Sequence, residues 1–142
     1  MKKLMLCLAI AFSMPAQADA IYTGGLSFHI DGKEDPDGYE YNNNHELIAI
    51  EYKSAFVATM INSYHTRSYA VGYSFSVIEA QYFNLDAVAG VIHGYTKEQN
   101  DILRMGSVNG FGSLILEANT PYVKPAVMLF GTAFVFSLKY EW

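Results

Sequence analysis

The side chains best suited to chemistry lie where strands are predicted to end. His29 closes one alternating segment, and Asn62 and Ser63 follow another. A serine hydroxyl is a poor nucleophile until a base removes its proton, and a histidine ring can do this near neutral pH. The same residues have ordinary structural uses, because histidines at strand ends are commonly solvated and Asn-Ser is common in turns. Residue types alone therefore leave a catalytic and a structural interpretation open.

Three further polar side chains lie in or beside predicted loops. His65 and Arg67 follow Ser63 in the same loop. They would suit lipid phosphates, because arginine matches phosphate geometry, although an exposed turn explains them equally well. His45, at the start of the next strand after His29, is an alternative base. The four histidines include no pair at clear metal-ligand spacing, so we expect neither a metal nor a cofactor.

The N-terminal segment has the pattern of an export signal. Two lysines precede an apolar run, and small residues follow. We expect residues 1–18 to be a signal peptide, with cleavage after Ala20 as the alternative, and residues 19–142 to form one domain. The single cysteine, Cys7, lies in the signal, which predicts a mature chain without disulfides or thiolate metal sites.

The mature chain alternates as outer-membrane strands do. From residue 132 to residue 142 an aromatic residue or Leu occupies every second position, and mostly small or polar residues lie between. Because successive side chains of a strand point to opposite faces, one face is apolar and the other polar. No mature segment approaches the roughly 20 apolar residues of a membrane helix. The predicted fold is all-β, an eight-stranded antiparallel transmembrane up-and-down β-barrel of the bacterial outer membrane.

The same alternation predicts where the strands lie. The expected strands cover residues 22–30, 45–53, 55–62, 68–77, 82–95, 102–108, 112–120 and a last strand that ends at residue 142. Tyr22 is predicted on the outer face of the first strand and His29 on its inner face. Asn109-Gly110 is predicted to form a hairpin turn, and residues 121–125 a proline-containing loop or interrupted edge.

The strand count also predicts which connections face outward. Both ends of such a barrel lie on the periplasmic side, so alternate connections face the exterior. The expected outer loops are residues 31–44, 63–67, 96–100 and 121–125. The turns near Lys53, Val77 and Asn109 are expected on the periplasmic side.

Charge excludes some functions. Without its two signal lysines the chain keeps 7 basic against 14 acidic residues, and no basic stripe could neutralise nucleic-acid phosphates. The inward residues Glu51, Glu117, Lys139 and Glu141 predict interior ion pairs or solvated strand ends. A diffusion pore is disfavoured, because eight strands leave room only for side chains or one small ligand.

Two segments resemble the lipid A palmitoyltransferase (PagP) family. Residues 27–34 (SFHIDGKE) match a family strand that ends in histidine before a long mobile loop. Residues 62–64 (NSY) and 70–75 (AVGYSF) stand where the family has Asp-Ser-Trp and a Gly-Tyr-Gly-Trp strand. The resemblance covers nearly the whole mature chain, and much of it is barrel pattern. Its distinguishing part is the spacing of His29 from Asn62 and Ser63.

The resemblance implies transfer of an acyl chain from a phospholipid to lipid A at the outer leaflet. It implies roles in this reaction for His29, Asn62 and Ser63. Asn62 replaces the family's aspartate, and a comparable change in a serine-protease triad costs about 10⁴ in rate. Ser74 stands at the glycine that forms the floor of the family's acyl pocket, which predicts an acyl chain shorter than palmitate.

The expected partners are phospholipid and lipopolysaccharide, together with the barrel-assembly machinery during insertion of a monomeric barrel. Two family features have no counterpart here: an amphipathic helix before the first strand, and a proline near Arg104 that is associated with lateral lipid access. Two alternatives therefore remain. One is a catalytically silent PagP-like barrel with a structural, surface-modifying or partner-binding role. The other is an unrelated small structural or adhesion barrel.

Overall fold

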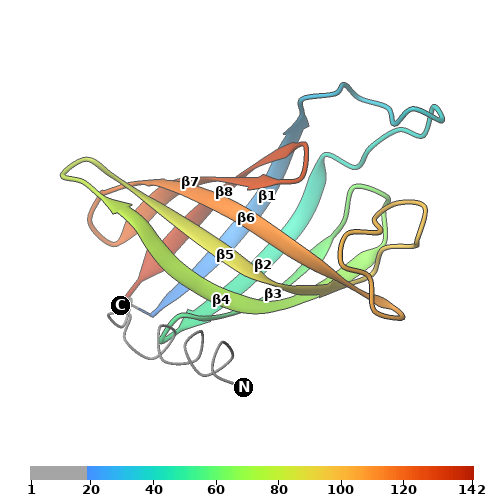
Figure 1. Ribbon diagram of the computed structural model, residues 1–142. Coiled ribbons are helices and arrows are strands. Elements are labelled where there is room, and N and C mark those ends of the chain that lie inside the picture. Colours follow the sequence, from blue (N-terminus) through green and yellow to red (C-terminus); the bar gives the residue numbers. More distant parts are fainter. Residues whose placement is uncertain (1–18) are drawn as a thin grey trace, which may run out of the picture.

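Eight strands with alternating side chains close into a β-barrel (Figure 1). The computed structural model describes residues 19–142; the predicted signal peptide and Cys7 lie outside this range. The strands are β1 (Ala20–His29), β2 (Asn44–Tyr52), β3 (Ala55–Ile61), β4 (Arg67–Glu79), β5 (Phe83–His93), β6 (Val108–Ala118), β7 (Val123–Phe130) and β8 (Ala133–Glu141). Each strand pairs antiparallel with its neighbours in the chain, and β1 also pairs with β8. The prediction of an eight-stranded, all-β antiparallel barrel is confirmed. Residues 19–142 contain no helix that is both long and apolar enough to cross a membrane.

The two faces of the barrel wall differ sharply in polarity. On β8, the outward Phe136 and Leu138 are 53% and 51% exposed, whereas the inward Ser137 and Lys139 are buried. The other strands also alternate, with large apolar side chains outside, whereas the interior holds the buried charged and polar groups together with a cluster of apolar side chains. Outward residues include Leu26, Phe28, Ile48, Ile50, Val57, Tyr69, Val71, Leu114 and Leu116. The alternation predicted for the C-terminal strand and for β4 is confirmed.

A β-bulge in β1 corrects one predicted orientation. The pairing of β1 with both neighbours shifts between Gly24 and Leu26. Gly24 and Gly25 have φ angles of +117° and +107°, which L side chains rarely adopt. The extra residue reverses the faces before the bulge. Tyr22 therefore points into the barrel and is fully buried, where its hydroxyl donates a hydrogen bond of 3.1 Å to Glu51, instead of lying on the outer face.

The predicted structure of two segments, the one before β6 and the one that contains Pro125, also needs correction. Residues 102–108, predicted as a strand, lie almost wholly in the β5–β6 connection, and Asn109-Gly110 belongs to β6 and forms no hairpin turn. The Asn109 side chain donates to the backbone oxygen of Asn100 at 2.5 Å and so holds that connection. Pro125 lies inside β7, one position beyond the last residue paired with β6, where its missing N–H costs no β6 hydrogen bond.

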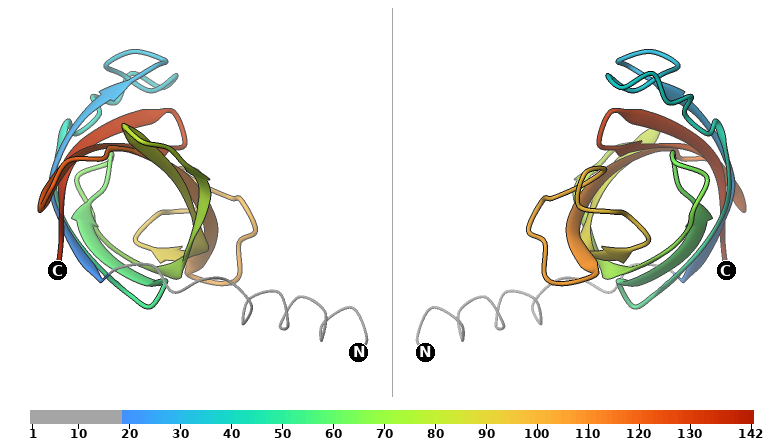
Figure 2. Two further views of the ribbon diagram at one scale, coloured as in Figure 1. Left: turned by 90° about the vertical axis from the view of Figure 1, so that its left-hand side faces the viewer. Right: turned by 90° about the vertical axis from the view of Figure 1, so that its right-hand side faces the viewer.

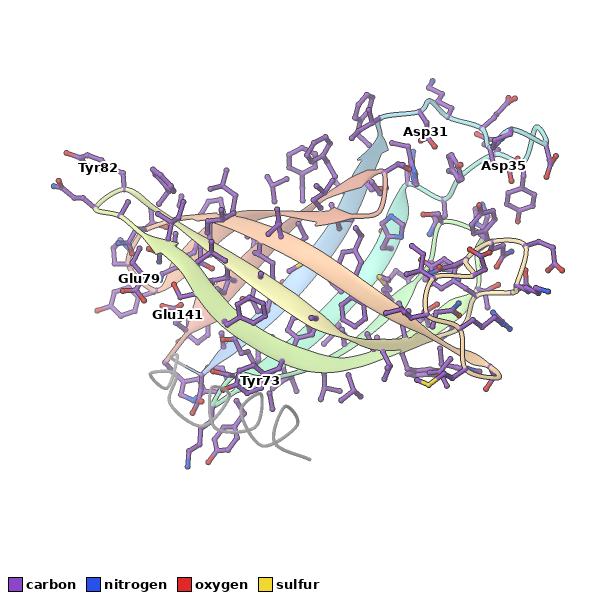
Figure 3. All side chains as sticks on the ribbon, in the orientation of Figure 1. Asp31, Asp35, Tyr73, Glu79, Tyr82 and Glu141 are labelled. Carbon is purple, nitrogen blue, oxygen red and sulfur yellow. The ribbon has the colours of Figure 1, made fainter. Side chains whose placement is uncertain are left out.

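These corrections change which connections share an end of the barrel. The β1–β2, β3–β4 and β5–β6 loops and the β7–β8 turn lie at the end where His29 terminates β1. The turn around Pro121 lies at the opposite end, beside the chain termini, because it joins β6 to β7. Figure 3 shows this division, with Asp31 and Asp35 at one end and Tyr82 and Glu141 at the other. Viewed along its axis, the barrel backbone forms a closed ring (Figure 2).

Candidate functional site

The structure brings His29 and Ser63 into contact. His29 is the last residue of β1, and Ser63 lies in the loop after β3. Nε2 of the imidazole is 3.2 Å from the serine Oγ, within hydrogen-bond distance. The strands of these two residues are not neighbours in the wall, because β2 lies between them. Their contact therefore depends on how the loops fold over this end of the barrel.

The long β1–β2 loop holds the His29 ring in place. Tyr41 stacks on the imidazole, with 4.0 Å between ring centroids and an interplanar angle of 12°. Burial, followed by the nearby Tyr64 and Asp31, raises the pKa of Tyr41 to about 12, so its phenol stays protonated near neutral pH. Nδ1 of His29 is buried and has no hydrogen-bond partner among the described residues. The carboxylate of Asp31 lies 3.9 Å from Nδ1, close enough to stabilise an imidazolium.

Asn62 has a different place from the one that the family resemblance implies. Its side chain is fully buried, and its Oδ1 accepts hydrogen bonds from the backbone N–H groups of Tyr64 and Thr66 at 2.9 and 3.0 Å. Its Nδ2 donates to Ser68 Oγ at 3.0 Å and to the backbone oxygen of Gly94 at 2.8 Å. These four bonds fasten the β3–β4 loop, and none of them reaches His29. Asn62 thus supports the loop that carries Ser63.

We expect Asn62→Asp, which restores the family's residue, to destabilise the barrel without raising activity. A carboxylate can still accept from the loop N–H groups, and the Ser68 hydroxyl can turn to donate to its second oxygen. That oxygen would also face the Gly94 carbonyl, so the bond to Gly94 would be lost and replaced by repulsion. The free energy of unfolding should fall by about 1–3 kcal/mol. Denaturant unfolding of the refolded protein measures this change. Asn43→Asp, at an exposed position of the β1–β2 loop, introduces the same charge and should leave stability nearly unchanged. Equal stability of Asn62→Asp and Asn43→Asp would contradict the loop-fastening role.

A second serine–histidine contact lies next to the first. His45 is almost fully buried near the start of β2, and its Nε2 is 2.7 Å from the Oγ of Ser27. The other ring nitrogen, Nδ1, is 2.6 Å from the backbone oxygen of Ile61. Sequence analysis considered His45 only as an alternative base and missed its partner. The available signal was the position of Ser27, two residues before His29 and so on the same face of β1.

Both histidines line one pocket inside the barrel. Its volume is about 370 Å³, within the range of roughly 300–1,000 Å³ typical of small-molecule sites. Its lining combines polar side chains, among them His29, His45, Ser63 and Tyr64, with apolar ones. The apolar lining includes Met60, Ile92, Phe111, Phe130 and Val135. A lining with both polar and apolar side chains suits an amphipathic ligand.

The barrel wall is incomplete beside this pocket. The pairing of β6 with β7 stops at Ser113 and Phe130, whereas β6 continues to Val108 with partners on β5. In Figure 1 this end of β6 runs away from the β7–β8 hairpin. Gly112 and Gly131 line both the interior pocket and a groove that contains the exposed Leu114. The interior pocket and the outer groove therefore share these two glycines, next to the point where the β6–β7 pairing ends.

The remaining predicted site residues lie apart from the two serine–histidine contacts. Ser74 is buried but does not line the pocket; a side-chain hydrogen bond joins it to Glu51, in the half of the barrel near the termini. Arg67 forms an exposed ion pair of 3.1 Å with Glu46. His65 packs its ring edge against Tyr39 in the same loop cluster. None of these three residues contacts the Ser63–His29 pair.

No family model, curated protein or solved structure matches the chain. Within residues 19–142, no group of three or more His, Cys, Asp or Glu side chains is arranged to hold a metal ion.

Proposed function

We propose that this protein is a PagP-like outer-membrane acyltransferase, which moves an acyl chain from a phospholipid to lipid A at the outer leaflet. The observation that carries the proposal is the 3.2 Å contact of Ser63 with His29 in the lining of a pocket that also has apolar walls. In this arrangement the pair removes the proton from the hydroxyl that attacks the lipid ester. The pocket holds the acyl chain and so positions the ester carbonyl beside that hydroxyl.

The polarity of the wall supports a membrane location. Large apolar side chains cover the outside of the barrel, and charged groups such as Glu117 and Lys139 are buried inside. A soluble barrel would expose this apolar surface to water, whereas lipid tails match it. The end that carries His29 would face the cell exterior, because it lies opposite the chain termini.

The gap beside β7 supports a lipid substrate. A phospholipid or lipid A molecule moves within its leaflet and reaches a barrel interior only through the wall. A lipid that entered beyond the last β6–β7 pair would cross no β6–β7 hydrogen bond, and the outer groove and the interior pocket share Gly112 and Gly131 there. These two glycines present no bulky side chain to a passing acyl chain.

Mass spectrometry of lipid A tests the proposal. Cells that express the wild-type protein should contain lipid A with one additional acyl chain, and this species should be absent from cells that express Ser63→Ala. Correct folding of the variant is checked by heat-modifiable migration on gels. Unmodified lipid A in cells with folded wild-type protein would refute the enzyme proposal and favour the catalytically silent barrel, whose partner-binding role would then be sought in the loop at residues 30–43.

The volume of the pocket should determine which acyl chain is transferred. Val135 lines the pocket and is buried, so Val135→Phe should shift the transferred chain to one shorter by roughly two carbon atoms, because a packed interior leaves the added ring no other space. Ser74→Gly should leave the chain length unchanged, since Ser74 lies outside the lining. Lipid A mass spectra of both variants measure this. A longer chain with Ser74→Gly would instead support the pocket-floor role that the family resemblance implies.

A further inference from the structure

We propose that Ser27 and His45 form a second catalytic pair in the same pocket and that Ser27 carries the acyl group as a covalent ester between donor and acceptor. This inference rests on the proposed acyltransferase function and adds the residue that receives the acyl chain first. In this mechanism one serine–histidine pair forms the acyl ester, and the neighbouring pair activates the acceptor.

Hydrogen bonding determines which nitrogen of His45 is the base. The backbone oxygen of Ile61 can only accept a hydrogen bond, so Nδ1, at 2.6 Å, carries a proton and donates it. In the neutral ring Nε2 is then unprotonated and accepts the hydrogen bond of the Ser27 hydroxyl at 2.7 Å. A nucleophile, a base and a group that orients the base are therefore in line, as in serine hydrolases, with a carbonyl in place of the usual carboxylate.

The His29 pair lacks this preparation. Ser63 is 3.2 Å from its histidine, and Nδ1 of that ring has no hydrogen-bond partner in residues 19–142. No hydrogen bond therefore holds His29 in one tautomer, and the Asp31 carboxylate, 3.9 Å from Nδ1, is beyond hydrogen-bond distance. A buried ring nitrogen without a partner suits a group that meets a substrate, since the substrate can supply the missing partner. We accordingly assign His29 and Ser63 to activation of the acceptor hydroxyl, and His45 to activation of the nucleophile Ser27.

Both pairs border the same pocket. Ser27 and His29 are alternate residues of β1 and point to the same side of the wall. Ser27 does not itself line the pocket, but it is only partly buried, and its register partner Val135 and its hydrogen-bond partner His45 both do. Ser63 and His29 line the pocket as well, so both pairs flank the space that an ester would occupy.

The reaction balances in two steps. First, the Ser27 hydroxyl gives its proton to His45 and its oxygen attacks the ester carbonyl of the donor; the bond to the glycerol oxygen breaks, and that oxygen leaves as the lysophospholipid alcohol with the proton from His45. Second, the acceptor hydroxyl attacks the acyl-Ser27 ester and gives its proton through Ser63 to His29. The bond to Ser27 breaks, and Ser27 regains a proton through His45, which exchanges with His29 through the water of the open pocket.

A long-chain alkyl fluorophosphonate tests the assignment independently of transfer. The serine oxygen displaces fluoride from phosphorus and leaves a stable adduct, which peptide mass spectrometry locates. In the refolded wild-type barrel the adduct should form on Ser27, and labelling should fall at least about 100-fold in His45→Gln. Glutamine at this position can still donate to the Ile61 oxygen but cannot remove the serine proton. Ser107→Ala, in the exposed β5–β6 loop, should label like the wild type.

The outcomes separate this inference from the proposed function. An adduct on Ser63 in place of Ser27, or no adduct on a folded barrel that modifies lipid A, would overturn the inference and leave the acyltransferase proposal standing. Lipid A that stays unmodified would instead overturn the acyltransferase proposal. Full labelling of folded His45→Gln would show that this histidine is only a structural support.

Discussion

Replacing His29 with glutamine is expected to lower acyl transfer to lipid A by about 10² to 10⁴-fold. Glutamine can keep a hydrogen bond to Ser63, but it cannot take up a proton near neutral pH. The imidazole is stacked on Tyr41 and packed beneath the loop, so a side chain of similar size should leave the fold intact. The measurement is the initial rate of transfer in vesicles that contain donor phospholipid and lipid A.

Two comparisons make this result specific. His93→Gln changes an exposed histidine at the end of β5, outside the pocket lining, and should transfer at the wild-type rate. Tyr41→Phe keeps the ring that stacks on His29 and should retain most of the activity, since the phenol stays protonated and serves as a packing surface. Transfer by His29→Gln within threefold of wild type would remove this histidine from the mechanism.

Replacing Lys139 with methionine is expected to lower the free energy of unfolding by about 3–5 kcal/mol. Its ammonium group lies inside the barrel, 3.0 Å from carboxylate oxygens of both Glu117 and Glu141 and 3.9 Å from Asp86. Methionine fills a similar volume but leaves buried carboxylates without this counter-charge. Lys124, which contacts Glu141 at 2.7 Å and Glu117 at 3.6 Å, can compensate only in part.

Denaturant titration followed by the fluorescence of Trp142, the only tryptophan of the chain, measures the loss. Lys33→Met, in the exposed β1–β2 loop, removes the same charge and should change stability by less than about 0.5 kcal/mol. The double variant Glu117→Gln with Lys139→Met should recover part of the loss, because it removes one unpaired carboxylate. Equal losses for Lys33→Met and Lys139→Met would mean that the interior ion pairs contribute nothing specific.

The interior ion pairs show that side-chain alternation predicts which face of the barrel wall a residue occupies. Glu51, Glu117 and Lys139 were placed inside the barrel from the period of their strands alone, and all three are buried there. Alternation reports the face of a residue reliably as long as the period is unbroken. The bulge at Gly24 and Gly25 breaks it, and the prediction for Tyr22 failed for this reason alone.

Predictions of strand positions were wrong where local residue preferences conflicted with the pairing of neighbouring strands. Asn-Gly favours a hairpin turn, yet Asn109 and Gly110 are extended in β6 because β5 offers them register partners along its whole length. Proline normally interrupts a ladder, yet Pro125 fits β7 because it lies just beyond the β6 partners. Neither circumstance is visible from the residues themselves.

Local patterns in the sequence were sufficient for the fold class and for the face of most side chains, because a strand has a period of two residues. The predicted count of eight agrees with the structure, but it includes a strand at residues 102–108 that is absent and leaves out β7. Which polar groups meet depends on tertiary contacts. Ser63 reaches His29 across an intervening strand, and Ser27 faces His45 because β1 and β2 pair in one particular register. Likewise, Asn62 turned out to fasten a loop, since its partners Ser68 and Gly94 come from elsewhere in the chain. Such contacts depend on barrel closure and loop packing, which are set by long-range pairing, and no local pattern encodes them.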